Sequence, residues 1–235
     1  MENHNRYAQP EQPNIQNAYR DLTIGFFVLM LVITVVRSML KESFGADYIS
    51  YLIPVFAPSM LAMMILAIRV IAALDHGRTM TRTIVVILLS AIILRVLSVI
   101  FSEALTFYLG LGSSLLLASA LIIVVYRLSF NLFLESNHII ERLWASVCVY
   151  FIIGTTFASF YSIILIIYPD ALGLTLMHPM EVYIYGMIYS LNVLSGFDPL
   201  ITETSETIKM LAILESTVTT LFLVILIGRL LGFSQ

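Results

Sequence analysis

The chain has 235 residues, of which 60% are hydrophobic and only 11% are charged. A soluble domain is about a quarter charged, so this composition indicates an integral membrane protein. The formal net charge of -3 argues against nucleic acid as a partner, because nucleic-acid-binding proteins present a basic face. The single cysteine, Cys148, excludes an intrachain disulfide.

The first half of the chain is a polar tail followed by four long apolar runs. Residues 1–20 are rich in Asn and Gln, which predicts a flexible cytoplasmic tail. A bilayer crossing needs roughly 20 apolar residues, so we expect residues 21–127 to form a peripheral bundle of four transmembrane helices. The expected spans are 22–36, 51–74, 83–101 and 105–126. The fourth run has no basic residue, and steep voltage gating, which needs several along one helix, is not expected.

The second half is expected to contain an interfacial linker helix, 128–142, and a pore module, 143–235. The module begins with a fifth span, 143–168, and ends with an apolar run from 210 to 231. Between them, residues 183–194 are apolar but too few to cross, and a polar turn with Ser195, Gly196 and Asp198 follows. A short helix and irregular turn before a spanning helix are the parts of a channel filter. We therefore expect an all-α membrane protein with six transmembrane helices and one re-entrant pore loop between helices five and six.

The basic residues predict the orientation of the chain. Cytoplasmic loops carry an excess of Lys and Arg near the ends of spans. A cytoplasmic N-terminus places more basic residues inside than outside, and it places the pore loop outside. The inner residues are Arg6, Arg20, Arg69, Arg78, Arg82, Arg127, Arg142 and Arg229, and the outer ones are Arg37, Lys41, Arg95 and Lys209.

The outer segments are acidic. No basic residue occurs between Arg142 and Lys209, whereas acids recur there. Rings of carboxylates select cations, so a cation is the predicted permeant ion. The alternative is that the outer loops are acidic merely because they are exposed.

The last fifth of the chain resembles the potassium-channel superfamily, and in particular small bacterial potassium-channel-like proteins. Its last helix has the sequence LAILE at 211–215, an apolar run over 221–227, and then Arg229, Leu230 and Gly232. Aligned without gaps, Ser190 falls on the pore-helix threonine of the family. The resemblance implies an ion-conduction filter formed by Val193, Leu194, Ser195, Gly196, Phe197 and Asp198.

The chain departs from the family pattern within this filter. Asn192 and Val193 fall on the Thr-Thr pair, while Ser195 and Phe197 replace both filter glycines. Gly196 stands where the family has tyrosine. These changes favour a less selective pore or a closed, non-conducting one. Thr219 occupies a position where related helices often have a hinge glycine.

Two acidic residues are candidates for function, and each has a structural alternative. Asp198 either attracts cations at the outer mouth or caps the backbone of an Asp-Pro turn. Glu215 lies inside an apolar run, where a carboxylate is costly and marks a candidate functional position. Its partner is expected to be a pore-helix hydroxyl, Asn192 or Lys209. We favour a buried hydrogen bond that joins the last helix to the pore helix.

The sequence thus predicts a homotetrameric cation channel of potassium-channel type with a non-standard filter, located in a plasma or bacterial inner membrane with both termini cytoplasmic. The expected partners are the lipid bilayer and monovalent cations, with K+ as the family's ion. The alternative is a non-conducting, channel-like scaffold or sensor. Motifs for enzyme chemistry, such as a phosphate-binding loop or HExxH, do not occur, and we expect neither cofactor nor metal.

Overall fold

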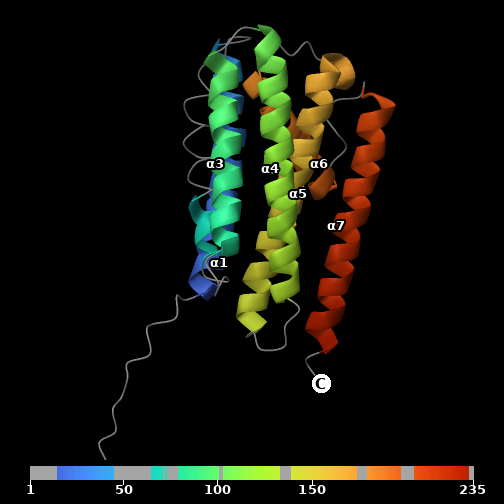
Figure 1. The fold of residues 1–235 in the computed structure, drawn as a ribbon. Helices are drawn as coiled ribbons and strands as arrows, with labels where there is room; N and C mark the ends of the chain where they lie inside the picture. Colours follow the sequence, from blue (N-terminus) through green and yellow to red (C-terminus); the bar gives the residue numbers. More distant parts are fainter. Residues whose placement is uncertain are drawn as a thin grey trace, which may run out of the picture.

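The computed structural model describes residues 15–44, 65–70, 72, 79–100, 103–132, 139–173, 179–196 and 204–232. These residues are helical almost throughout and contain no strand. The helices stand side by side, with α4 in front of α5 at the centre of the view and α7 at one flank (Figure 1). Their bounds are α1 Ile15–Phe44, α3 Thr79–Ile100, α4 Glu103–Leu132, α5 Ile139–Ile167, the 3-10 helix η2 Pro169–Leu172, α6 Pro179–Ser195 and α7 Glu206–Gly232.

Four of the described helices are long and apolar enough to cross a membrane, as the third, fourth, fifth and last apolar runs predicted. They are Thr81–Ser98 in α3, Leu105–Phe130 in α4, Arg142–Ile167 in α5 and Glu206–Gly228 in α7. This is the pattern of an all-helical, multi-pass membrane protein. The first expected span lies within α1, and the second lies largely outside the described residues, so the count of six stays a prediction.

The stretch expected to form a linker helix, 128–142, is divided between two long helices. Residues 128–132 continue α4, residues 139–142 belong to α5, and 133–138 lie outside the described residues. Both helices therefore extend past the expected ends of their spans.

The core centres on α5, which packs against α1, α4, α6 and α7. On one side Phe26 of α1 stacks on Phe151, with ring centroids 5.5 Å apart. On the other, α6 lies against α5 in the upper half of the bundle (Figure 1). The serine and threonine hydroxyls of α5 donate to carbonyls of α5 itself, as Thr156 does to the carbonyl of Ile152 at 2.8 Å.

Two breaks follow α5 and set the position of α6. Pro169 opens η2, and Gly173 ends it with φ 66°, a left-handed conformation that glycine adopts at little cost. Pro179 then occupies the first position of α6, where its missing N–H has no helical partner to lose.

Candidate functional site

Small residues bring α5 and α6 into close contact. A Cβ atom at Gly186 of α6 would lie 2.8 Å from the carbonyl oxygen of Ala158 and 3.0 Å from the Ser162 hydroxyl. One turn and two turns further along α6, Ser190 and Leu194 lie against Gly154. Small side chains at helix interfaces let backbones approach closely in membranes. α6 is thereby fixed antiparallel to α5.

The buried carboxyl of Glu215 joins three helices. The hydroxyl of Tyr161, on α5, donates to Glu215 Oε2 at 2.8 Å. The hydroxyl of Ser190, on α6, donates to Glu215 Oε1. All three side chains are buried, and Glu215 has no exposed surface. We call these three residues, with the Gly154 carbonyl that Ser190 also contacts, the Glu215 cluster.

Ser190 holds the middle position in this cluster. Its oxygen lies 2.8 Å from the carbonyl of Gly154 as well as within hydrogen-bond distance of Glu215. A serine hydroxyl has one proton, so Ser190 donates either to the Glu215 carboxyl or to the Gly154 carbonyl at any moment. One side chain thus connects the backbone of α5 to the carboxyl on α7, and α6 cannot slide without breaking both contacts.

The C-terminal end of α6 is capped against the middle of α5. The Tyr150 hydroxyl donates to the Leu194 carbonyl at 2.7 Å. The Ser195 hydroxyl donates to the Asn192 carbonyl at 3.0 Å, and the Gly196 N–H donates to the Val193 carbonyl at 3.2 Å. Gly196 has φ 69°, the left-handed conformation that commonly ends a helix. Three successive carbonyls at this end therefore already have donors.

Beyond α6 the chain is next described near η2, at the level where α6 began. Gly154, against which Leu194 packs, lies roughly 20 Å along α5 from Ile167, at 1.5 Å per residue. The next described residues reach η2, where the Ser205 N–H donates to the Ala171 carbonyl at 2.8 Å. Ser205 also caps α7, since its Oγ lies 3.4 Å from the N–H of Ile208. α6 thus stops halfway along α5, and α7 starts beyond the far end of α5.

The structure brings together some of the predicted site residues. Ser190 and Glu215 are hydrogen-bonded, as expected of a carboxyl that joins the last helix to the pore helix. Thr219 is buried one turn further along α7, and its hydroxyl donates to the Glu215 carbonyl at 2.7 Å. Asn192 is half-buried near the end of α6.

Three of the six residues predicted to form the filter lie in a helix. Val193, Leu194 and Ser195 are the last residues of the α6 helix, so they do not form an extended row of carbonyls. Helix formation continues because the segment before Gly196 has no residue that interrupts it. Phe197 and Asp198 lie outside the described residues.

A half-buried arginine on α3 contacts an aromatic ring of α6. The guanidinium carbon of Arg95, on α3, lies 5.7 Å from the centroid of the Tyr183 ring on α6. A cation over an aromatic face is attracted by the negative face of the ring, more strongly where water is absent. Arg69, which lies within the second expected span, is exposed.

The sequence analysis did not single out the two α5 tyrosines that bond to α6 and α7. Tyr161 and Tyr150 lie inside an apolar run, where a buried phenol is expected to find a hydrogen-bond partner; that was the available signal. Gly186 and Gly154 are likewise recognisable only once their neighbour helix is known.

Among the side chains that the structure describes, no three of His, Cys, Asp or Glu gather as metal ligands would. No known protein family matches the chain, and neither a curated protein nor a solved structure matches it.

Proposed function

We propose that the chain is one subunit of a homotetrameric transmembrane cation channel of potassium-channel type with a non-standard filter. One observation carries the proposal: α6 ends against the middle of α5, while Ser205 lies back beside η2. In a bilayer crossed by α5 and α7, this makes α6 a re-entrant helix. A re-entrant helix is tolerated only where protein or a water-filled cavity covers its end.

The charges near α6 support a cation as the permeant ion. The carboxyl end of a helix carries about half a negative charge, and that end of α6 lies at mid-depth. Asp170 and Glu206 are exposed at the end of the bundle where α6 enters. Carboxylates at a mouth raise the local cation concentration. We propose that this end faces outward and that both termini are cytoplasmic in a plasma or bacterial inner membrane.

Four copies are proposed because one re-entrant loop cannot surround an ion. The Glu215 cluster would hold each α6 at a fixed height and angle to the shared axis. Its role is then positional, because Glu215 has no exposed surface from which to touch an ion. Selective passage of K+ among monovalent cations would depend on residues after Gly196.

A second candidate is a non-conducting, channel-like scaffold or sensor. The carbonyls of Asn192, Val193 and Leu194 all accept hydrogen bonds within the protein. Carbonyls that are already engaged offer less to a dehydrated ion. This observation favours an assembly that kept the pore architecture without the pore's activity.

Cation flux in reconstituted vesicles tests the proposal. Purified full-length protein is expected to release K+ down its gradient and to exclude chloride. Asp198→Asn is expected to lower the flux several-fold, whereas Asp170→Asn, a matched change of an exposed acid at the same end, is expected to lower it less. Equal flux in both variants would show that Asp198 has no specific role in cation conduction.

The same preparation separates the two candidates. Particle images should show fourfold symmetry for either one. If planar bilayers show no ionic current under varied pH, voltage and tension, and the fourfold symmetry is intact, the scaffold is favoured. A monomeric or twofold particle would contradict both.

A further inference from the structure

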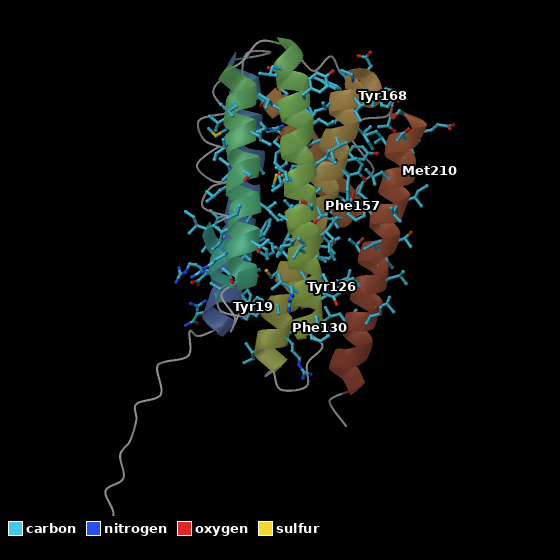
Figure 2. All side chains as sticks on the ribbon, in the orientation of Figure 1. Tyr19, Tyr126, Phe130, Phe157, Tyr168 and Met210 are labelled. Carbon is cyan, nitrogen blue, oxygen red and sulfur yellow. The ribbon has the colours of Figure 1, made fainter. Side chains whose placement is uncertain are left out.

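Two exposed tyrosines mark the surface of α4. Tyr108 and Tyr126 are 70% and 67% exposed. At 1.5 Å per residue they lie roughly 27 Å apart along the helix, which is close to the roughly 30 Å thickness of a hydrocarbon core. Tyr168 is also exposed and lies at the Tyr108 end, since Ile166 packs beside Gly110. Figure 2 shows Tyr168 near one end of the bundle and Tyr126 near the other.

The surface between these tyrosines is apolar. The exposed Ser119 on α4 satisfies its hydroxyl within the helix, by donating to the Leu116 carbonyl at 2.8 Å. The large exposed side chains between the two levels are Val86, Leu89, Ile93 and Val96 on α3 and Leu115 and Ile122 on α4. Tyr is enriched where an apolar slab meets the polar interface, so the two tyrosine levels indicate where the hydrocarbon ends.

Exposed arginines gather at the Tyr126 level. The Thr106 hydroxyl donates to the Ser98 carbonyl at 2.9 Å, which joins the end of α3 to the start of α4. Arg82, near the start of α3, and Arg127, near the end of α4, therefore both lie at the opposite end of the bundle, and both are exposed. By axial rise Arg82 lies roughly 6 Å from the Tyr126 level, a distance that an arginine side chain covers by snorkelling.

A third exposed arginine, Arg20, lies at the same end of the bundle. Its helix, α1, meets the start of α5, where the Thr23 hydroxyl lies 3.5 Å from the Trp144 carbonyl. Arg20 is paired with Asp21 at 3.4 Å, which is the one ion pair among the described residues. Arg82 and Arg127 are exposed on this part of the surface and take no part in that pair.

We propose that Arg82 and Arg127 bind the phosphates of anionic phospholipids in the leaflet that meets the Tyr126 end of the bundle. A guanidinium presents paired N–H donors that match phosphate geometry. The acyl chains of the same lipids would cover the apolar surface that begins one to two turns away. This surface recognises a lipid headgroup held at the interface rather than a free phosphate ion. The inference does not depend on ion conduction.

Lipid preference in nanodiscs tests this proposal. Full-length protein is reconstituted in phosphatidylcholine with a small fraction of phosphatidylglycerol, and the lipids retained on the purified particle are measured by native mass spectrometry. Each interfacial arginine contributes about a fivefold preference for anionic lipid, so the double variant Arg82→Gln/Arg127→Gln is expected to lose about 25-fold. Lys209→Gln, which removes an exposed cation at the opposite end, should retain the preference.

Circular dichroism of each variant confirms that the helices are intact. A double variant that is folded and still prefers phosphatidylglycerol would overturn the proposal. Displacement of the lipid by millimolar inorganic phosphate would overturn it as well, because the arginines would then form an ion site.

The depth of the tyrosines is a separate measurement. Trp144 is the single tryptophan, so Trp144→Phe removes the protein's own tryptophan fluorescence. Tyr108→Trp, Tyr126→Trp and Leu115→Trp are each introduced into that variant. Lipids brominated near the chain end should quench tryptophan at 115 most and tryptophan at 108 and 126 least. Strongest quenching at 126 would place the arginines inside the hydrocarbon and contradict the inference.

Discussion

α5 and α7 are both apolar helices of spanning length, yet the protein uses them differently. In the candidate span of α5, Arg142–Ile167, 56% of the length is buried inside the protein, compared with 17% in that of α7, Glu206–Gly228. α5 contacts α1, α4, α6, α7 and η2, whereas α7 contacts α5, α6 and η2. The buried residues of α7 form one stripe: Ile208, Glu215, Thr219, Phe222 and Leu226.

This difference shows that apolar character does not identify the centre of a membrane bundle. Lipid is as apolar as leucine, so an exposed apolar face has no drive to be buried. Small residues that allow close approach mark α5, as Gly154 and Ala158 do. Hydrogen-bonding groups mark the attachment of α7, where Glu215 bonds to α5 and α6. Substitutions at Gly186, Glu215 and Tyr150 test this contrast, and their expected effects decrease in that order.

The largest effect is expected from Gly186→Val, which forces α6 away from α5. A Cβ there would lie 2.8 Å from the Ala158 backbone oxygen, which cannot move aside as a flexible side chain can. Overpacking of this kind typically costs about 1–3 kcal/mol, and the backbone clash places Gly186→Val at the upper end. The free energy of unfolding in mild detergent, measured by denaturant titration, should fall accordingly.

Gly228→Val is the matched control for this substitution. Gly228 lies on the exposed side of α7, and a Cβ there meets nothing within 4 Å. Its stability should stay close to that of the parent. Equal losses in the two variants would show that α6 does not pack on α5 as described.

Glu215→Leu should destabilise the protein somewhat less, by detaching α7 from the core. The hydroxyls of Tyr161 and Ser190 would lose their shared acceptor, and each buried unsatisfied group costs about 1–3 kcal/mol. Ser190 keeps the Gly154 carbonyl as a second acceptor, which limits its share. The thermal midpoint in detergent measures the loss.

Glu215→Gln should be much milder than Glu215→Leu. A carboxamide oxygen can accept from Tyr161, and its N–H can donate to the Ser190 oxygen, which leaves the Ser190 hydroxyl for Gly154. If the Gln and Leu variants melted at the same temperature, the hydrogen bonds of the cluster would not be what holds α7.

The smallest effect is expected from Tyr150→Phe. It removes the donor to the Leu194 carbonyl, a neutral hydrogen bond with a net contribution of about 0.5–1.5 kcal/mol. Hydrogen exchange in the last turn of α6 should accelerate while α5 is unaffected. Tyr126→Phe, at an exposed position, should leave that exchange unchanged; similar acceleration in both would argue against a local cap.

Much of the helical framework was predictable from the sequence. The apolar runs located α3, α4, α5 and α7 because each is long enough to span, and the shortness of the run before Ser195 set α6 apart. The carboxyl of Glu215 in an apolar run predicted a partner among a pore-helix hydroxyl, Asn192 and Lys209, and the structure shows the hydroxyl of Ser190 as one of its two partners. These predictions succeed because the length of an apolar run and the presence of a polar group within it can be read from neighbouring residues alone.

The details that depend on a neighbouring helix were not predictable. The ungapped alignment assigned Val193 and Leu194 to an extended filter, whereas the helix continues to Ser195. Nothing local opposes helix there, and Tyr150, 44 positions earlier in the chain, supplies the cap. The role of Gly186 depends equally on the position of Ala158.

The cap on α6 also constrains the order in which the chain is assembled during biogenesis. In the re-entrant placement proposed above, α6 cannot be integrated by the translocon as an independent segment, because its terminal carbonyls would meet hydrocarbon. α5 must already be in place to present Tyr150, and α7 must follow to present Glu215 to Ser190. The loop containing α6 is therefore expected to settle last, after the flanking helices are inserted.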